Sequence, residues 1–202
     1  MKKNNSVFFT LFISISFLFA QQPDKPTTSE IFHKLQKLNF LGSAMYIAAH
    51  PDDENTRIIS FLSNDVHART AYLSMTRGDG GQNLVGPEIR ESLGVIRTQE
   101  LIAARKTDGG QQYFTRANDF GYSKYPEETL EIWNKEDVLN YVVLNIRRFQ
   151  PDIIINRFNH RNPGRTHGHH TASAMLSFEA FDLVGTVNNY PDSAEKYGTW
   201  QP

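Results

Sequence analysis

Four short apolar segments separated by helical patterns constrain the fold of this chain more than any other feature. The apolar segments lie at residues 44–49, 70–75, 112–114 and 152–155. Helical periodicity predicts helices around them, at residues 30–39, 54–62, 87–108, 136–149 and 170–183. This alternation predicts an α/β fold with a mostly parallel sheet and helices on both of its faces.

The composition narrows the function. The chain holds 21 Lys plus Arg against 22 Asp plus Glu, so its charge gives no reason to expect nucleic acid or an anionic membrane as a partner. It has no cysteine, which excludes disulfides, thiolate metal sites and a cysteine nucleophile. Any metal must be held by His, Asp or Glu, a ligand set that suits zinc, with iron(II) as the alternative.

Residues 1–20 have the pattern of a secretory signal peptide. Lys2 and Lys3 precede an apolar stretch at 7–20 that is short for a membrane-spanning helix. An uncleaved anchor is the alternative. We expect an exported protein, periplasmic or extracellular, without a transmembrane span after cleavage. Residues 21–41 then form a linker and short helix, and residues 42–202 form the main domain.

Polar segments capable of catalysis follow three of the predicted strands. They are H-P-D-D-E at 50–54, R-G-D-G-G at 77–81 and H-G-H-H at 167–170. Ligands of open α/β sheets bind beyond the carboxyl ends of the strands. The three segments are therefore expected to converge on one edge of the sheet.

Residues 50–54 place three carboxylates in a row behind a histidine. Like charges repel, and partial burial raises the cost of keeping them ionised. A cation would resolve this conflict, with one carboxylate binding it and a neighbour acting as a base on bound water. The alternative is an Asp that only caps the following helix.

The H-G-H-H segment places His167 and His170 three residues apart. At a helix start this spacing puts both on one face, one as a ligand and one as a hydrogen-bond donor. His169 is expected to point elsewhere. A solvated polar loop is the alternative. The chain has neither a G-x-S-x-G turn nor a Walker A sequence that would offer a rival chemistry.

A-H-P-D-D-E, T-R-G-D-G-G and the late H-x-x-H together resemble the PIG-L or LmbE-like family over roughly residues 42–183. The resemblance implies a Rossmann-like sheet and a metal-dependent de-N-acetylase. It also implies an amino-sugar substrate carrying an N-acetyl group, of the N-acetylglucosaminyl type, as a small molecule or glycan.

The resemblance also implies roles for individual residues. His50, Asp53 and His170 would bind the metal. Asp52 would be the general base, and His167 would stabilise the oxyanion. Arg77 would approach the substrate.

The chain departs from the family in its late motif, where H-P-D-H is usual. Gly168 and His169 replace the Pro and the Asp, so His169 is an alternative third ligand. The domain of this family also usually continues past the position that residues 198–202 occupy here. This predicts that the sequence is part of a longer protein or that the last strands of the domain are missing.

Two other functions compete with deacetylation. One is a non-catalytic carbohydrate-binding module on the same scaffold. The other is a different metal-dependent hydrolase, although a two-metal phosphoesterase would need more bridging carboxylates than the sequence places. Several further polar and aromatic residues are expected to be solvated or to pack structurally, namely Arg97, Glu100, Trp133, Trp200 and the cluster Arg157, His160, Arg161 and Arg165.

Overall fold

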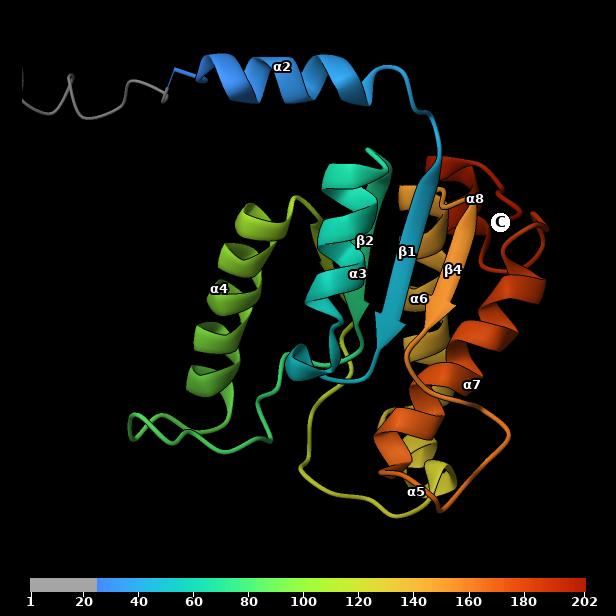
Figure 1. The fold of residues 1–202 in the computed structure, drawn as a ribbon. Helices are drawn as coiled ribbons and strands as arrows, with labels where there is room; N and C mark the ends of the chain where they lie inside the picture. The colour runs from blue at the N-terminus through green and yellow to red at the C-terminus, as the bar shows by residue number, and fades with distance from the viewer. Residues whose placement is uncertain (1–24) are drawn as a thin grey trace, which may run out of the picture. The chain divides into compact units, whose positions relative to one another are not determined.

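A four-stranded, all-parallel sheet forms the centre of the protein in this computed structural model, which describes residues 25–202. Its order is β3-β2-β1-β4 (Figure 1). The strands are β1 (Ser43–Ala48), β2 (Arg69–Ser74), β3 (Gln111–Phe114) and β4 (Ile153–Asn156). Each lies within a residue or two of its predicted position, so the predicted parallel sheet is confirmed.

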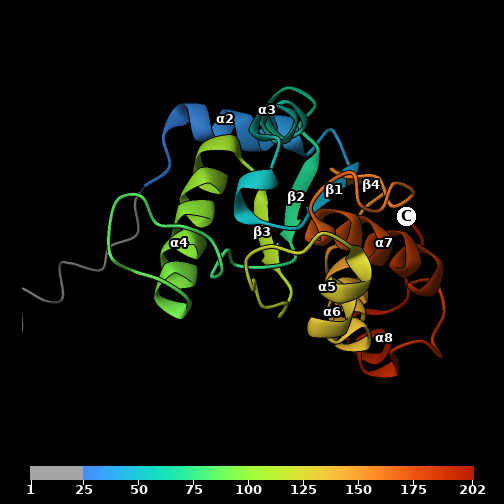
Figure 2. The same ribbon diagram turned by 90° about the horizontal axis from the view of Figure 1, so that it is seen from below.

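Helices cover both faces of this sheet, as predicted (Figures 1 and 2). α3 (Thr56–Ser60) and α4 (Glu91–Asp108) lie on one face, and α6 (Lys135–Phe149) and α7 (Gly168–Leu183) lie on the other. Two short helices that the sequence did not suggest, α5 (Pro126–Ile132) and α8 (Pro191–Tyr197), pack beside α7 and α6 respectively.

The central strand β1 explains why the sheet is covered twice. Every one of its residues is buried. Met45 and Ile47 belong to the core under α6 and α7, whereas Tyr46 and Ala48 belong to the core under α3 and α4. Successive strand residues point to opposite faces, so a strand that is buried throughout requires cover on both sides.

The boundaries of two helices differ from their prediction. α4 begins at Glu91, so the predicted start at Pro87 is wrong. Arg90 has φ 53°, a left-handed backbone angle that interrupts any helix before it. Gly109, with φ 80°, ends α4 as predicted. The helix predicted at 54–62 corresponds to α3, which is shorter and is followed by the π-helical turn η3 (Phe61–Asp65).

The N-terminal part of the chain, up to Gln36, is a separate unit. It contains all but the last residue of helix α2 (Thr28–Lys37). Thr27 and Glu30 form a capping box at the start of this helix: the Thr27 N–H donates to Glu30 Oε2 at 2.6 Å, and the Glu30 N–H donates to Thr27 Oγ1 at 3.3 Å. The predicted signal peptide lies outside the described residues. Within residues 25–202, no helix combines the length and apolar character needed to cross a bilayer.

Candidate active site

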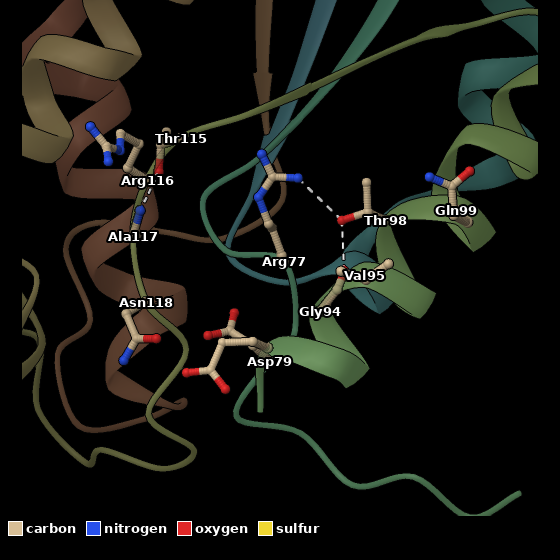
Figure 3. A pocket seen from close by; sticks show the side chains of 11 residues that line it. Arg77, Asp79, Gly94, Val95, Thr98, Gln99, Thr115, Arg116, Ala117 and Asn118 are labelled. Carbon is tan, nitrogen blue, oxygen red and sulfur yellow. Dashed lines mark hydrogen bonds between the residues drawn. The ribbon is translucent and has the colours of Figure 1, made fainter. Parts of the chain in front are cut away.

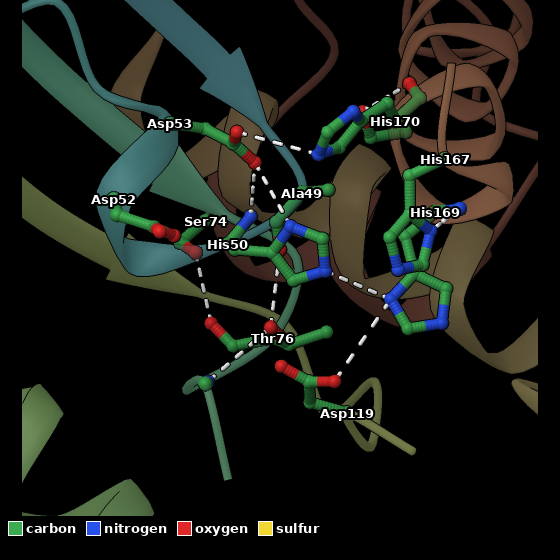
Figure 4. Close-up of polar contacts among 12 residues, drawn as sticks. Ala49, His50, Asp52, Asp53, Ser74, Thr76, Asp119, His167, His169 and His170 are labelled. Atoms are coloured by element: carbon green, nitrogen blue, oxygen red, sulfur yellow. Dashed lines mark hydrogen bonds and ion pairs between the residues drawn. The ribbon is translucent and has the colours of Figure 1, made fainter. Parts of the chain in front are cut away.

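The carboxyl end of β1 brings residues 50–53 against the start of α7. Four imidazole rings face one another there, from His50, His167, His169 and His170 (Figure 4). Their centroids lie 4.3–5.3 Å apart. The predicted convergence of the first and last polar segments therefore occurs.

His50 and Asp53 are joined by a tight 3₁₀ turn, η2 (Pro51–Asp53). The His50 backbone N–H donates to Asp53 Oδ2 at 2.8 Å, and the Asp53 N–H donates to the His50 carbonyl at 3.2 Å. The hydroxyl of Tyr72 also donates to that carbonyl. The turn folds the carboxylate back, so that Asp53 Oδ2 lies 3.1 Å from His50 Nδ1.

His170 reaches the same carboxylate from α7. Its Nε2 lies 3.4 Å from Asp53 Oδ1. The ring stacks on Phe158, which follows β4, with centroids 3.9 Å apart and planes 4° from parallel. Asp53 is therefore flanked by two imidazoles from opposite ends of the sequence.

The three carboxylates of residues 52–54 point in different directions. Asp53 joins the histidines. The Asp52 side chain is 72% exposed, with Oδ1 3.6 Å from Nη2 of Arg97 on α4. Glu54 Oε1 lies 3.3 Å from Nη2 of Arg105, which also pairs with Asp108 at 2.5 Å. Arginines thus reduce the repulsion at Asp52 and Glu54, which leaves Asp53 as the only one of the three facing the histidines.

His167 is the N-cap of α7, with ψ 138°, and is not part of the helix. Its Nδ1 accepts the backbone N–H of His169 at 3.1 Å, so Nε2 carries the proton and donates to the Gly121 carbonyl at 2.8 Å. His169 is fully buried and its Nδ1 lies 2.8 Å from His50 Nε2. The prediction that His169 points elsewhere is therefore wrong.

Two glycines allow neighbouring loops to approach this site. A Cβ on Gly168 would lie 2.4 Å from Ser123 Oγ, and its N–H donates to the Ser123 carbonyl at 2.8 Å. A proline would lose that hydrogen bond and clash. A Cβ on Gly80 would lie 2.3 Å from the Asp119 carbonyl. The departure from H-P-D-H at Gly168 therefore has a packing cause.

The electrostatics of the cluster couple its members. Burial alone would lower the pKa of His50, but the hydrogen bond and charge of Asp53 raise it above the usual value. Burial alone would raise the pKa of Asp53, but His50 and His170 lower it. Burial lowers the pKa of His169 to about 2 and that of His170 to about 4, so both rings are neutral at pH 7.

These residues fit a divalent ion. One ligand atom each from His50, Asp53 and His170 lies within 4.8 Å of the others. Two imidazoles, which bind metal in their neutral form, and one carboxylate form a three-ligand set. Such a set is typical of catalytic zinc, which keeps a fourth coordination position open. A second group, His50, His167 and His169, meets the same distance limit and shares His50.

Two residues at this edge were not among the predicted site residues. Asp119 Oδ1 lies 4.0 Å from His169 Nδ1 and accepts the Gly121 N–H at 2.9 Å. Arg97 was expected to be solvated or a structural partner, and it pairs with Asp52. Asp119 follows β3, so the strand-end rule could have found it. Arg97 lies inside a helix and carried no such signal.

Arg77 lies in a separate groove of about 470 Å³ between α4 and residues 115–118 (Figure 3). Its Nη1 donates to Thr98 Oγ1 at 3.2 Å, and its guanidinium carbon lies 4.7 Å from the centre of the Phe114 ring. The side chain therefore faces this groove and not the histidine cluster. Asp79 and Asn118 also line the groove, beside Asp119.

Comparison with known proteins assigns the family. The model of the PIG-L family, described as GlcNAc-PI de-N-acetylase, matches residues 45–181. The chain belongs to the PIG-L family. It is accordingly an enzyme, a de-N-acetylase of the metal-dependent amide hydrolases.

Two solved structures have a similar fold. One is the N,N'-diacetylchitobiose deacetylase from Pyrococcus horikoshii, with a TM-score of 0.61 and 19% identity, covering 89% of this chain and 69% of that one. The other is GalB, the 4-carboxy-2-hydroxymuconate hydratase from Pseudomonas putida KT2440, with a TM-score of 0.57 and 19% identity, covering 75% and 60%. The PIG-L fold thus also occurs in a protein named for a different reaction.

Proposed function

We propose that this PIG-L protein is a zinc-dependent hydrolase that removes N-acetyl groups from an amino sugar of the N-acetylglucosaminyl type. The observation that carries the proposal is the convergence of His50, Asp53 and His170, whose ligand atoms lie within 4.8 Å of one another. The exposed carboxylate of Asp52, which directly precedes Asp53 in the chain, is paired with Arg97. The family and the chitobiose deacetylase with the same fold favour an N-acetylated sugar as the substrate.

His50, Asp53 and His170 would hold the ion. Zinc bound there would polarise the acetyl carbonyl and lower the pKa of a bound water towards about 7. The protein supplies a ligand set in which the Asp53 carboxylate is ionised and His170 is neutral, so little proton displacement is needed at these two residues.

Asp52 would act as the general base. It accepts a proton from the attacking water and later gives it to the departing nitrogen. The amide C–N bond breaks, and acetate and the free amine leave. Arg97 Nη2 lies 3.6 Å from Asp52 Oδ1 and would orient this carboxylate.

His167 would stabilise the oxyanion that develops on the attacked carbonyl. Burial lowers the pKa of His167, and the Gly121 carbonyl opposes this shift. The neutral ring therefore has one N–H to offer, at Nε2, which the Gly121 carbonyl accepts before substrate arrives. The oxyanion would take the place of that carbonyl as the acceptor.

Acetate release tests the proposal. The zinc-loaded protein is incubated with N-acetylglucosamine, its β-linked disaccharide and an N-acetylglucosaminyl-inositol compound, and acetate is measured. Release from at least one, absent from Asp52→Asn with equal zinc content, is expected. Sugar binding without acetate release would instead identify a carbohydrate-binding module, and release from Asp52→Asn at the wild-type rate would exclude Asp52 as the base.

We also propose that the enzyme acts outside the cytoplasm. The support is the signal-like pattern of residues 1–20. N-terminal sequencing of the protein recovered from periplasmic and medium fractions tests this. A mature chain beginning at Gln21 is expected, and recovery only from the cytoplasm with an intact Met1 would contradict it.

A further inference from the structure

His169 occupies an unusual place for a histidine of the late motif. It has no exposed surface, and Phe120, Trp133 and His167 surround its ring with centroids 4.3–4.9 Å away. Its Nε2 is buried and has no hydrogen-bond partner. Burying a polar nitrogen without a hydrogen bond costs free energy, so another interaction of the same ring must compensate for this cost.

The side-chain hydrogen bond of His169 is with His50, and Asp119 Oδ1 lies farther from the same nitrogen, at 4.0 Å. His169 Nδ1 lies 2.8 Å from His50 Nε2, while the other nitrogen of His50, Nδ1, faces Asp53 at 3.1 Å (Figure 4). The two nitrogens of one imidazole are thus directed to two different neighbours. Whichever nitrogen is protonated determines which one is free to bind an ion.

We infer that His169 is a positioning residue, whose Nδ1 accepts the Nε2–H of His50 and so presents His50 Nδ1 to the ion shared with Asp53 and His170. This inference rests on the metal site of the proposed function. Ligand histidines generally donate their second N–H to an acceptor that fixes the ring and its tautomer. Here the acceptor is another imidazole, at the position where the family usually has an aspartate.

Direct ligation by His169 is the competing arrangement. Two nitrogens bound to one tetrahedral zinc at about 2.0–2.1 Å lie roughly 3.3 Å apart. The observed 2.8 Å is shorter and is a normal hydrogen-bond length. The geometry therefore favours a hydrogen bond between His50 and His169 over a shared ion.

Zinc affinity in two variants tests the inference. An Asn side chain places a polar atom where Nδ1 stands, whereas Leu fills similar space without an acceptor. We expect His169→Leu to bind zinc about 10–100-fold more weakly than the wild type. His169→Asn should retain affinity within about threefold. His50→Ala defines complete ligand loss, and thermal unfolding of each metal-free variant confirms that it folds.

The outcomes separate this inference from the proposed function. Equal zinc affinity in wild type and His169→Leu would overturn the positioning role alone. Loss in His169→Asn as severe as in His50→Ala would make His169 a ligand and also overturn it. A wild type that binds no zinc would overturn both.

A measurement on the wild type removes any dependence on variant folding. Long-range ¹H–¹⁵N correlation spectra of the zinc-loaded protein report the tautomer of each histidine. His50 is expected to be protonated at Nε2 and zinc-bound at Nδ1. Zinc on Nε2 of His50 would contradict the proposed hydrogen bond. Excess zinc should also restore the kcat of His169→Leu to within a few fold of wild type, because His169 does not touch the substrate.

Discussion

The carboxyl ends of β1 and β3 carry two regions of opposite character. At β1, His50, Asp53 and His170 are largely buried and face one another at 3.1–3.4 Å. In the groove beside β3, Arg77 and Arg116 are exposed. Arg77 contacts Thr98 and the Phe114 ring, and Arg116 contacts Tyr141. The first region concentrates ionisable groups at a desolvation cost, and the second leaves its polar groups in water.

This difference indicates different tasks. Burying neutral histidines beside an ionised carboxylate is costly, and an ion would compensate for it by drawing the ligands together. A solvated arginine in an open groove costs little and suits hydroxyl groups of a variable substrate. The chemistry should therefore depend steeply on the cluster and only weakly on the groove.

Removing the central carboxylate should have the largest effect. Asp53→Ala is expected to lose zinc and reduce kcat/KM by about 10⁴-fold or more, because two imidazoles remain without the charge between them. Metal content by mass spectrometry and acetate release measure this. His160→Ala, which alters a half-buried histidine stacked on Phe178, is the matched control and should retain both. Zinc retained by Asp53→Ala would remove this residue from the ligand set.

Asp52→Asn should separate binding from chemistry. It is expected to keep zinc and to lower kcat by about 10³-fold, since the base is lost while the ligands remain. Stopped assays on the zinc-saturated variant measure kcat, with the exposed Asp65→Asn as control. Loss of zinc in parallel with activity would show that Asp52 binds the metal. The separate roles of Asp52 as base and Asp53 as ligand would then be wrong.

The buried rings should make the metal-free protein sensitive to acid. The pKa of His169 is about 2 in the fold against 6.5 ordinarily, so below pH 6.5 the unfolded chain binds one more proton at this ring. His169 therefore costs stability as pH falls from 6.5, by about 2 kcal/mol at pH 5, and His170, with a pKa lowered to about 4, adds a loss of the same sign. The raised pKa of His50 acts in the opposite direction in every variant that keeps it.

Urea unfolding of the metal-free protein at pH 7.5 and pH 5 measures this loss. His169→Asn should lose about 2 kcal/mol less than the wild type over this interval, because its side chain does not titrate. The same pH dependence in both proteins would mean that His169 is accessible to protons in the fold. The cluster would then be open to solvent, as the groove is, although its side chains are buried in the structure.

Much of the fold was predictable because its signals are local. The apolar run ending at Ala49 and the glycine at 109 each specify an element without reference to distant residues. The start of α4 was not predictable in this way. Pro87 is a good helix-opening residue, but Arg90 has a positive φ that interrupts the helix, and the residue type of Arg90 does not predict that backbone angle.

The sequence predicted which residues form the site, but not how their side chains are oriented. His50, Asp53 and His170 converge because strand ends and helix starts share an edge. The helical spacing argument for His167 and His170 failed in one respect, since His167 is the cap and its ring turns back over the helix start. Side-chain direction depends on packing against Phe120 and Trp133, which lie far from His169 in sequence.

Arg77 tests the groove side of the comparison and should give the smallest effect. Replacing it with Met removes the guanidinium but keeps length, and we expect KM to rise by about 2–10-fold with kcat nearly unchanged, as for one or two lost hydrogen bonds. Arg57→Met, an exposed arginine on α3, is the control. Because Arg77 faces Thr98 and Phe114, a substrate that ends at the first sugar should not detect the change, whereas a longer one should. A large fall in kcat on a monosaccharide would place Arg77 at the reacting amide. The groove and the histidine cluster would then not have separate roles.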